Sequence, residues 1–179
     1  MNTAQQLEDG FQDEGSSPGV AQYLTFILAG EEYGVDILRV QEIKGWERVT
    51  PIPNTPEFIK GVINLRGTIV PIIDLRQRFG LEWKEYGKTT VVIVLKVRHE
   101  ERERTMGIVV DAVSEVYDVQ PEETKPTPDF GGVVDTDSVK GLATVDGKMI
   151  ILLDIDHLIN AGVLEHLGGM GEEAADSAS

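Results

Sequence analysis

The sequence of 179 residues contains no cysteine, which excludes disulfide bridges, thiolate catalysis and zinc ribbons and fits a reducing compartment. Long apolar runs are also missing, since no stretch approaches the roughly 18 residues of a membrane helix. The N-terminus has no basic segment followed by an apolar one, as a signal peptide would have. We therefore expect a cytoplasmic protein that is not inserted directly into a membrane.

Basic residues are few, with 16 Lys and Arg against 31 Asp and Glu, and the formal net charge is −15. A nucleic acid duplex or an anionic membrane surface would repel such a chain over a Debye length of roughly 8 Å. The composition therefore argues against nucleic acid as a partner. Part of the acidic excess lies near the two ends, in Glu8, Asp9, Asp13, Glu14, Glu172, Glu173 and Asp176.

Both ends of the chain are polar and contain too few apolar residues to offset the entropy cost of ordering them. We expect residues 1–20 and 168–179 to be disordered tails, the first of them acidic. The length and the 41% hydrophobic content suit one compact domain, or two small subdomains that share a core.

The central part of the chain alternates short β-branched runs with turn residues such as Gly30, Gly67 and Gly147. This pattern is typical of an all-β barrel or sandwich. Helix is predicted only as a short turn at 75–79 and as a C-terminal helix at 155–167. The predicted strands are 23–28, 33–37, 40–43, 58–63, 68–73, 89–97, 105–110, 113–116, 139–144 and 148–153.

The sequence also repeats itself. Residues 58–75 align with 138–155 at an offset of 80, and residues 34–43 align with 107–116 at an offset of 73. The loop 130–136 is expected to absorb the difference of seven residues between the two offsets. Positions that coincide include Lys60/Lys140, Gly61/Gly141, Gly67/Gly147 and Asp74/Asp154.

Two units of this size have little private core and must pack against each other, which predicts two small barrels related by an approximate two-fold. We expect the first barrel to span 21–87 and the second to span 88–167, including the C-terminal helix.

The residues that could carry chemistry do not form a constellation. His157 and His166 are nine residues apart on the predicted last helix, and His99 lies in a charged hairpin tip. The segment from Asp135 to Asp137 lacks the ligand spacing of an EF-hand. We therefore expect no catalytic residue, no metal site and no cofactor.

Two further acids invite a structural interpretation. Asp74 and Asp154 end equivalent strands just before a helical turn, where a carboxylate can accept hydrogen bonds from backbone amides. Their recurrence in both repeats favours helix capping over catalysis.

The turn 64–67 is distinctive because it differs between the repeats. Asn64 and Gly67 tolerate positive φ, which would present Leu65 and Arg66 at the tip. The second repeat has Asp146 where the first has Arg66. A guanidinium suits a carboxylate or a carbonyl-rich surface, although a solvated turn arginine explains the residue equally well at this point.

Other positions have structural interpretations of their own. Val40, Glu42 and Val116 lie at or near matched repeat positions, since Val40 corresponds to Val113 and Ile43 to Val116, and β-branched residues there are more often core than interface. Pro71 stands where the second repeat has Ile151, and proline within a strand is mostly confined to edges or bulges. It predicts an exposed or irregular edge in the first barrel.

The chain resembles the CheW family of bacterial chemotaxis coupling proteins over about residues 20–167. The resemblance implies a mainly β fold of two SH3-like five-stranded barrels packed around a shared core, with a C-terminal helix. It rests on Glu32-Tyr-Gly-Val-Asp-Ile-Leu-Arg-Val-Gln-Glu-Ile-Lys-Gly45, on Asn54-Thr-Pro-Glu-Phe-Ile-Lys-Gly-Val-Ile-Asn-Leu-Arg-Gly-Thr-Ile-Val-Pro-Ile-Ile-Asp-Leu75 and on Gly107-Ile-Val-Val-Asp-Ala-Val-Ser-Glu-Val116.

The same resemblance implies a non-enzymatic adaptor that joins the cytoplasmic tip of chemoreceptors to the regulatory domain of the histidine kinase CheA, which is itself CheW-like. Such a protein would be recruited to receptor arrays at the inner face of the membrane. By match to the family's motif positions, the receptor-binding residues would be Val40, Glu42, Arg66 and Val116.

The kinase or array interface is expected on the exposed ends of both barrels, including residues 45–53, with Val49, Pro51 and the substitution-sensitive Gly61 as its residues. Two alternatives remain. One is a CheW-like module of a larger protein, such as a kinase regulatory domain or a receiver-fused coupling protein, although polar tails at both ends favour a free-standing coupler. The other is a small β-barrel enzyme or ligand binder with a polar pocket.

Overall fold

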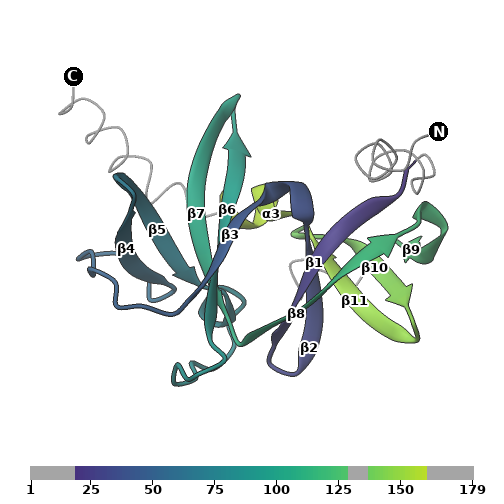
Figure 1. The fold of residues 1–179 in the computed structure, drawn as a ribbon, viewed down its shortest axis with the longest axis horizontal. Helices are drawn as coiled ribbons and strands as arrows, with labels where there is room; N and C mark the ends of the chain where they lie inside the picture. The colour runs from purple at the N-terminus through teal and green to yellow at the C-terminus, as the bar shows by residue number, and fades with distance from the viewer. Residues whose placement is uncertain (1–18, 129–136, 161–179) are drawn as a thin grey trace, which may run out of the picture.

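The computed structural model describes residues 19–128 and 137–160. Most of both predicted tails, the loop 130–136, Asp135, His166 and the predicted helix beyond residue 160 lie outside the described residues. Within them the protein is mainly β, as expected, with two sheets and short helical turns (Figure 1).

The first half of the chain contains the strands β1 (Ala21–Leu28), β2 (Glu31–Asp36), β3 (Val40–Gly45), β4 (Ile59–Leu65) and β5 (Thr68–Asp74), with the 3-10 turn η1 (Ile37–Arg39) and the helix α2 (Leu75–Arg78). The second half contains β6 (Val91–His99), β7 (Arg102–Val110), β8 (Ala112–Val119), η2 (Pro121–Glu123), β9 (Thr124–Lys125), β10 (Val139–Val145), β11 (Lys148–Leu153) and the helix α3 (Ile155–Ile159).

Each sheet takes strands from both repeats. The five-stranded sheet has the order β3-β6-β7-β5-β4, and the six-stranded sheet has the order β8-β1-β2-β11-β10-β9. The hairpin β1–β2 therefore lies with the last strands of the chain, while β6–β7 lies with β3, β4 and β5 (Figure 1). The strand pairing thus differs from the expected division at residues 87 and 88, because the chain crosses between sheets after β2 and again after β7.

The two sheets are equivalent strand by strand, which confirms the predicted twin arrangement. The parallel pair of Ile72 with Gly107 in one sheet corresponds to the parallel pair of Leu152 with Gly34 in the other. A Cβ at Gly107 would lie 2.6 Å from Cδ1 of Ile72, so a larger residue would disrupt this approach of the strands. The six-stranded sheet exceeds the expected five strands through β9, whose counterpart is the single bridge between Thr50 and Val62.

The hydrophobic core is shared between the sheets and supplemented by one smaller cluster in each barrel. The shared cluster includes Phe26 and Leu28 from one sheet and Ile93 and Leu95 from the other, all fully buried. Burying each side chain of this size stabilises the fold by roughly 1.5–3 kcal/mol. Equivalent residues fill the two private clusters, with the pairs Ile63/Ala143, Leu65/Val145, Val70/Ile150 and Ile72/Leu152.

Pro71 lies at a local, irregular edge, as predicted, although β5 as a whole is an inner strand of the sheet. β5 lies between β4 and β7 in the sheet, and Pro71 is paired with Val62. The parallel pairing with β7 begins only at Ile72. The missing amide of the proline therefore falls just before the ladder that it would have interrupted.

Both predicted helix caps are confirmed. A side-chain oxygen of Asp74 accepts a hydrogen bond from the amide of Gln77 at 3.2 Å, and Asp154 accepts one from the amide of His157 at 3.0 Å. Each carboxylate satisfies an amide that would otherwise have no partner in the first turn.

Two ion pairs connect the helices to the points where the chain changes sheet. The Arg76 guanidinium of α2 binds Asp111, between β7 and β8, with an Nε–Oδ1 distance of 3.0 Å. The Arg39 guanidinium of η1 binds Asp156 of α3 at 2.5 Å. Burial alone would raise the pKa of both carboxyl groups, but hydrogen bonds from the arginines and from backbone amides outweigh it and lower each pKa.

Replacing Gly61 with alanine is expected to destabilise the fold by more than about 2 kcal/mol. Gly61 has φ of 144°, and a Cβ there would lie 2.1 Å from the carbonyl oxygen of Thr50. Chemical denaturation measures the loss. Gly45→Ala is the control, because no atom lies within 4 Å of its Cβ position and its φ is not positive. Equal stability of the two variants would contradict the argument.

The ion pairs also predict a pH dependence. Because the pKa of Asp111 is lower in the folded protein than its unfolded value of about 3.9, its contribution is complete above about pH 5 and is lost as the pH falls through the folded pKa. Asp111→Asn should cost on the order of 1 kcal/mol at neutral pH, after allowance for solvent screening, and progressively less in acid.

Unfolding free energies of wild type and Asp111→Asn, measured from about pH 7 to pH 3, test this dependence. Asp118→Asn is the control, because that exposed carboxylate accepts a hydrogen bond from the Gln22 side chain on the sheet surface. A difference between wild type and Asp111→Asn that stays constant over the whole range would count against it.

Candidate functional site

The turn between β4 and β5 places Arg66 in an unusual backbone conformation. Arg66 has φ of 51° and Gly67 has φ of 90°, while Asn64 does not have positive φ. The Asn64 side chain instead accepts a hydrogen bond from the Gly67 amide at 2.8 Å. Leu65 is buried, so only Arg66 of the two predicted tip residues is presented to solvent.

Arg66 reaches from this turn to β3 and forms an ion pair with Glu42. Nη2 of Arg66 lies 2.5 Å from Oε2 of Glu42, and the Arg66 side chain remains 70% exposed. The hydrogen bond from Arg66 lowers the pKa of Glu42 below its ordinary value. The structure thus brings together two of the four predicted receptor-binding residues, and much of the guanidinium stays accessible to another carboxylate or carbonyl group.

Val40 and Val116 lie on β3 and β8, which occupy equivalent positions in the two sheets. Val40 is half-buried and packs against the shared core, as the core interpretation expected. Val116 is 48% exposed, and its repeat equivalent Ile43 is 43% exposed, so neither belongs to the core. The core interpretation of Val116 is therefore wrong, because β8 turns this side chain outward.

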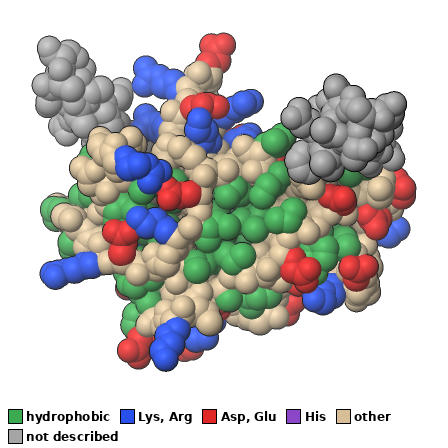
Figure 2. Space-filling view, in the orientation of Figure 1, with side chains coloured by type: hydrophobic (Ala, Val, Ile, Leu, Met, Phe, Trp, Pro, Cys, Tyr) green, Lys and Arg blue, Asp and Glu red, His purple; other side chains and the backbone are tan. Residues whose placement is uncertain are grey.

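An apolar area covers the middle of the face shown in Figure 2, where Figure 1 draws β1, β3 and β8. The exposed large apolar side chains of these central elements and of η1 are Leu38, Ile43 and Val116. Leu38 is 85% exposed, which is a high value for a leucine next to a core. β3 thus carries both the exposed Ile43 and the ion pair of Glu42 with Arg66.

The residues expected at the kinase interface lie around the segment between β3 and β4. Val49 is partly buried against the private cluster of the five-stranded sheet, and Pro51 is exposed. Gly61 is buried beneath this segment, because the backbone of Thr50 and Pro51 lies directly over it. Gly61 therefore acts on any surface here only by shaping the segment above it.

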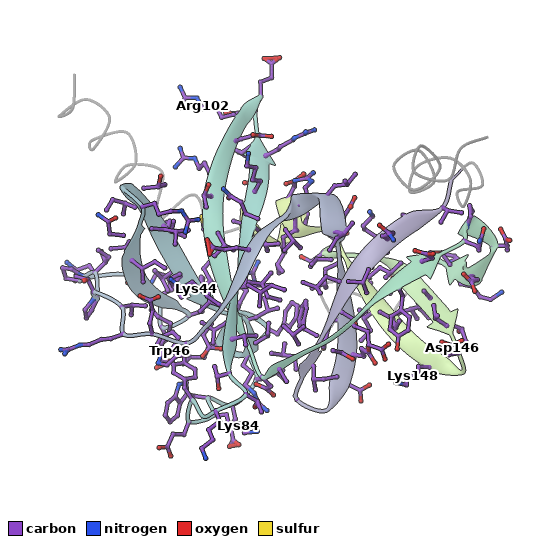
Figure 3. All side chains as sticks on the ribbon, in the orientation of Figure 1. Lys44, Trp46, Lys84, Arg102, Asp146 and Lys148 are labelled. Atoms are coloured by element: carbon purple, nitrogen blue, oxygen red, sulfur yellow. The ribbon has the colours of Figure 1, made fainter. Side chains whose placement is uncertain are left out.

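An aromatic cluster lies next to this segment, and sequence analysis did not single it out. The rings of Trp46 and Tyr86 are 4.3 Å apart between centroids, and those of Trp83 and Tyr86 are 5.9 Å apart. Trp83 is 51% exposed. Figure 3 shows Trp46 and Lys84 at the lower end of the five-stranded sheet. Both tryptophans of the sequence lie against Tyr86, and their positions in the sequence alone do not show that they are close in space.

A small polar cavity lies behind this cluster. It has a volume of about 70 Å³ and is lined by residues that include Asp74, Arg76, Tyr86 and Asp111. The Tyr86 hydroxyl donates a hydrogen bond to Asp74 at 2.5 Å, and burial is the main reason that the pKa of Tyr86 is raised. Ligand sites usually have roughly 300–1,000 Å³, so this cavity is too small for a metabolite.

The titratable residues do not assemble into a reaction centre in the part of the chain that the structure describes. His99 lies at the tip of the β6–β7 hairpin, and His157 lies on α3. Over residues 19–128 and 137–160, no group of three His, Asp or Glu side chains is arranged to hold a metal ion. None of the described helices is long and apolar enough to cross a membrane.

Comparisons with known proteins agree with this arrangement. Residues 22–163 match the CheW-like domain. The chain is 49% identical over 140 residues to the chemotaxis protein CheW of Klebsiella aerogenes, covering 78% of this chain and 82% of that protein. It is 36% identical over 138 residues to the CheW protein of Rhizobium meliloti, covering 77% and 86% respectively.

A solved structure shows the same fold. The scaffolding protein TtCheW from Thermoanaerobacter tengcongensis superposes with a TM-score of 0.70 at 38% identity, covering 80% of this chain and 94% of that chain. Family match, sequence identity and structure all cover the twin-barrel region described above, and the chain therefore belongs to the CheW family of chemotaxis proteins.

Proposed function

We propose that this chain is a non-enzymatic adaptor that couples chemoreceptors to the histidine kinase CheA. The observation that carries the proposal is the central face, where η1, β3 and β8 present exposed apolar side chains, together with the Glu42–Arg66 ion pair that is attached to the same strand β3. Such a surface suits a partner with an apolar stripe and an acidic or carbonyl-rich flank, as a helical receptor tip can provide.

Val40, Glu42, Arg66 and Val116 form the receptor-binding set in this proposal. The hydrogen bond to Glu42 restrains the Arg66 side chain, so part of the entropy cost of ordering this side chain is met before a partner arrives. Val116 and Ile43 present apolar surface at equivalent places on the two central strands.

The kinase contacts belong to the end of the five-stranded sheet. Val49 packs against the same private cluster as Trp46 and Tyr86, and Pro51 follows it on the same segment. Tryptophan and tyrosine are common among residues that dominate binding energy. Figure 3 shows Trp46 and Lys84 at the lower end of this sheet, below Lys44 of β3, and in this proposal one molecule contacts both partners at once.

A scaffold of this kind works by differential contacts and needs no reactive group. It changes kinase activity only if it contacts the active and inactive arrangements of its partners unequally. Individually weak interfaces suffice, because repetition in an array raises their effective strength. The site of action in this proposal is the cytoplasm, at receptor arrays on the inner face of the membrane.

Arg66→Ala should weaken receptor binding about tenfold, which corresponds to about 1.4 kcal/mol, without loss of the fold. The matched control is Asp146→Ala, which removes a charged residue with φ of 51° from the equivalent turn of the other barrel. Co-sedimentation with receptor-containing membranes measures the binding. Unchanged affinity of the Arg66 variant would remove this residue from the proposed site.

Trp83→Ala should weaken kinase binding by about tenfold or more while leaving receptor binding intact, because Trp83 is half-exposed on the aromatic cluster. Met149→Ala is the control, since Met149 is 60% exposed at the far end of the other barrel. A reconstituted kinase assay with receptor and CheA reports on both contacts. If the Met149 variant is impaired and the Trp83 variant is not, the kinase surface lies on the other barrel.

A further inference from the structure

The two ion pairs at the sheet crossings occupy equivalent places, and their polarity is reversed. Arg76 and Asp156 are equivalent helix positions at the offset of 80. Their partners Asp111 and Arg39 lie at the two points where the chain crosses between the sheets. At the offset of 73, Asp111 corresponds to Leu38, so the two partners differ by one position in the aligned repeats. In the first ion pair the helix carries the basic residue, Arg76. In the second ion pair the helix carries the acidic residue, Asp156.

Backbone hydrogen bonds confirm that the places correspond. Asp111 accepts a hydrogen bond from the amide of Ala29 at 2.9 Å, and Asp156 accepts one from the amide of Arg98 at 2.8 Å. Phe26 and Leu95 are equivalent, because they pair with Tyr33 and Met106, which correspond at the offset of 73. Ala29 and Arg98 each follow these residues by three positions, so their amides are equivalent too. The two acids therefore bind equivalent amides, although they come from different elements.

Each ion pair joins the first repeat to the second. Arg76 and Arg39 belong to the first repeat, residues 21–87, and Asp111 and Asp156 belong to the second, residues 88–160. If two first repeats from different chains packed together in the native geometry, Arg76 would face Arg39. If two second repeats did so, Asp156 would face Asp111.

Backbone pairing alone would not prevent such an exchange. Every strand pair of one sheet has a counterpart in the other, so like repeats could form the same ladders between two chains. The side chains of the two ion pairs are only 16–27% exposed, and like charges in such partly desolvated places repel.

We propose that the reversed polarity of the Arg76–Asp111 and Arg39–Asp156 ion pairs makes each repeat pack with the other repeat and not with its own kind. The device suppresses an exchanged dimer in which two copies of this chain combine like repeats. It acts by repulsion in the wrong assembly as well as by attraction in the right one.

A cycle of four full-length proteins tests this specificity. The proteins are wild type, Arg76→Asp/Asp111→Arg, Arg39→Asp/Asp156→Arg, and the variant that combines all four substitutions. Both native ion pairs keep opposite charges in each protein. When either ion pair alone is reversed, positions 76 and 39 carry opposite charges, and so do positions 111 and 156. Packing of like repeats is then charge-matched. With both pairs reversed, like repeats repel again.

Each protein is unfolded, refolded at high concentration and analysed by size-exclusion chromatography with light scattering. The dimer fraction should rise about tenfold or more in both single-pair variants, as expected when about 1.4 kcal/mol of repulsion is removed. It should return to the wild-type level in the fourfold variant. Exchange between unlike repeats is charge-matched in all four proteins and would give equal dimer fractions.

Equal dimer fractions across the cycle, or a fraction that simply grows with the number of substitutions, would overturn the proposal. Circular dichroism checks that each protein folds. If a reversed pair does not fold, Arg76→Gln/Asp111→Asn removes the like charges with side chains of similar shape. That variant should give an intermediate dimer fraction, and a fraction equal to that of wild type would refute the charge mechanism.

Discussion

The exchange of hairpins between the two repeats is the constraint on which the rest of the structure depends. The hairpin β6–β7 completes the sheet of β3, β4 and β5, and the hairpin β1–β2 completes the sheet of β8 to β11. Neither repeat can form a barrel with its own strands in this arrangement. The shared core around Phe26, Ile93 and Leu95 follows directly, because all three of these buried side chains are carried by the exchanged hairpins.

This exchange also sets the geometry of the surfaces. β3 and β8 follow the two crossings, so they come to lie at equivalent places in the centre of the molecule (Figure 1). Their outward positions Ile43 and Val116 form apolar surface there, while the outer ends of the barrels carry other features, such as the cluster around Trp83.

Several features could be predicted from the sequence because they depend on local chemistry or on the internal repeat. The repeat itself, the caps at Asp74 and Asp154, and the mainly β architecture are confirmed. The predictions that failed depend on strand neighbours. Val116 was assigned to the core because a sequence does not reveal which way an edge strand turns its side chains, and Leu65 was assigned to a turn tip although its alternation places it in a private cluster.

By itself, the sequence determined the twin-unit fold and the family, since repeats and motifs are written in residue order. The tertiary structure alone decided that the units exchange hairpins, that Glu42 holds Arg66, and that the two tryptophans meet at Tyr86. The physical reason is that these contacts join residues far apart in the chain. Which of many chemically similar strands and charges become neighbours depends on packing the whole core.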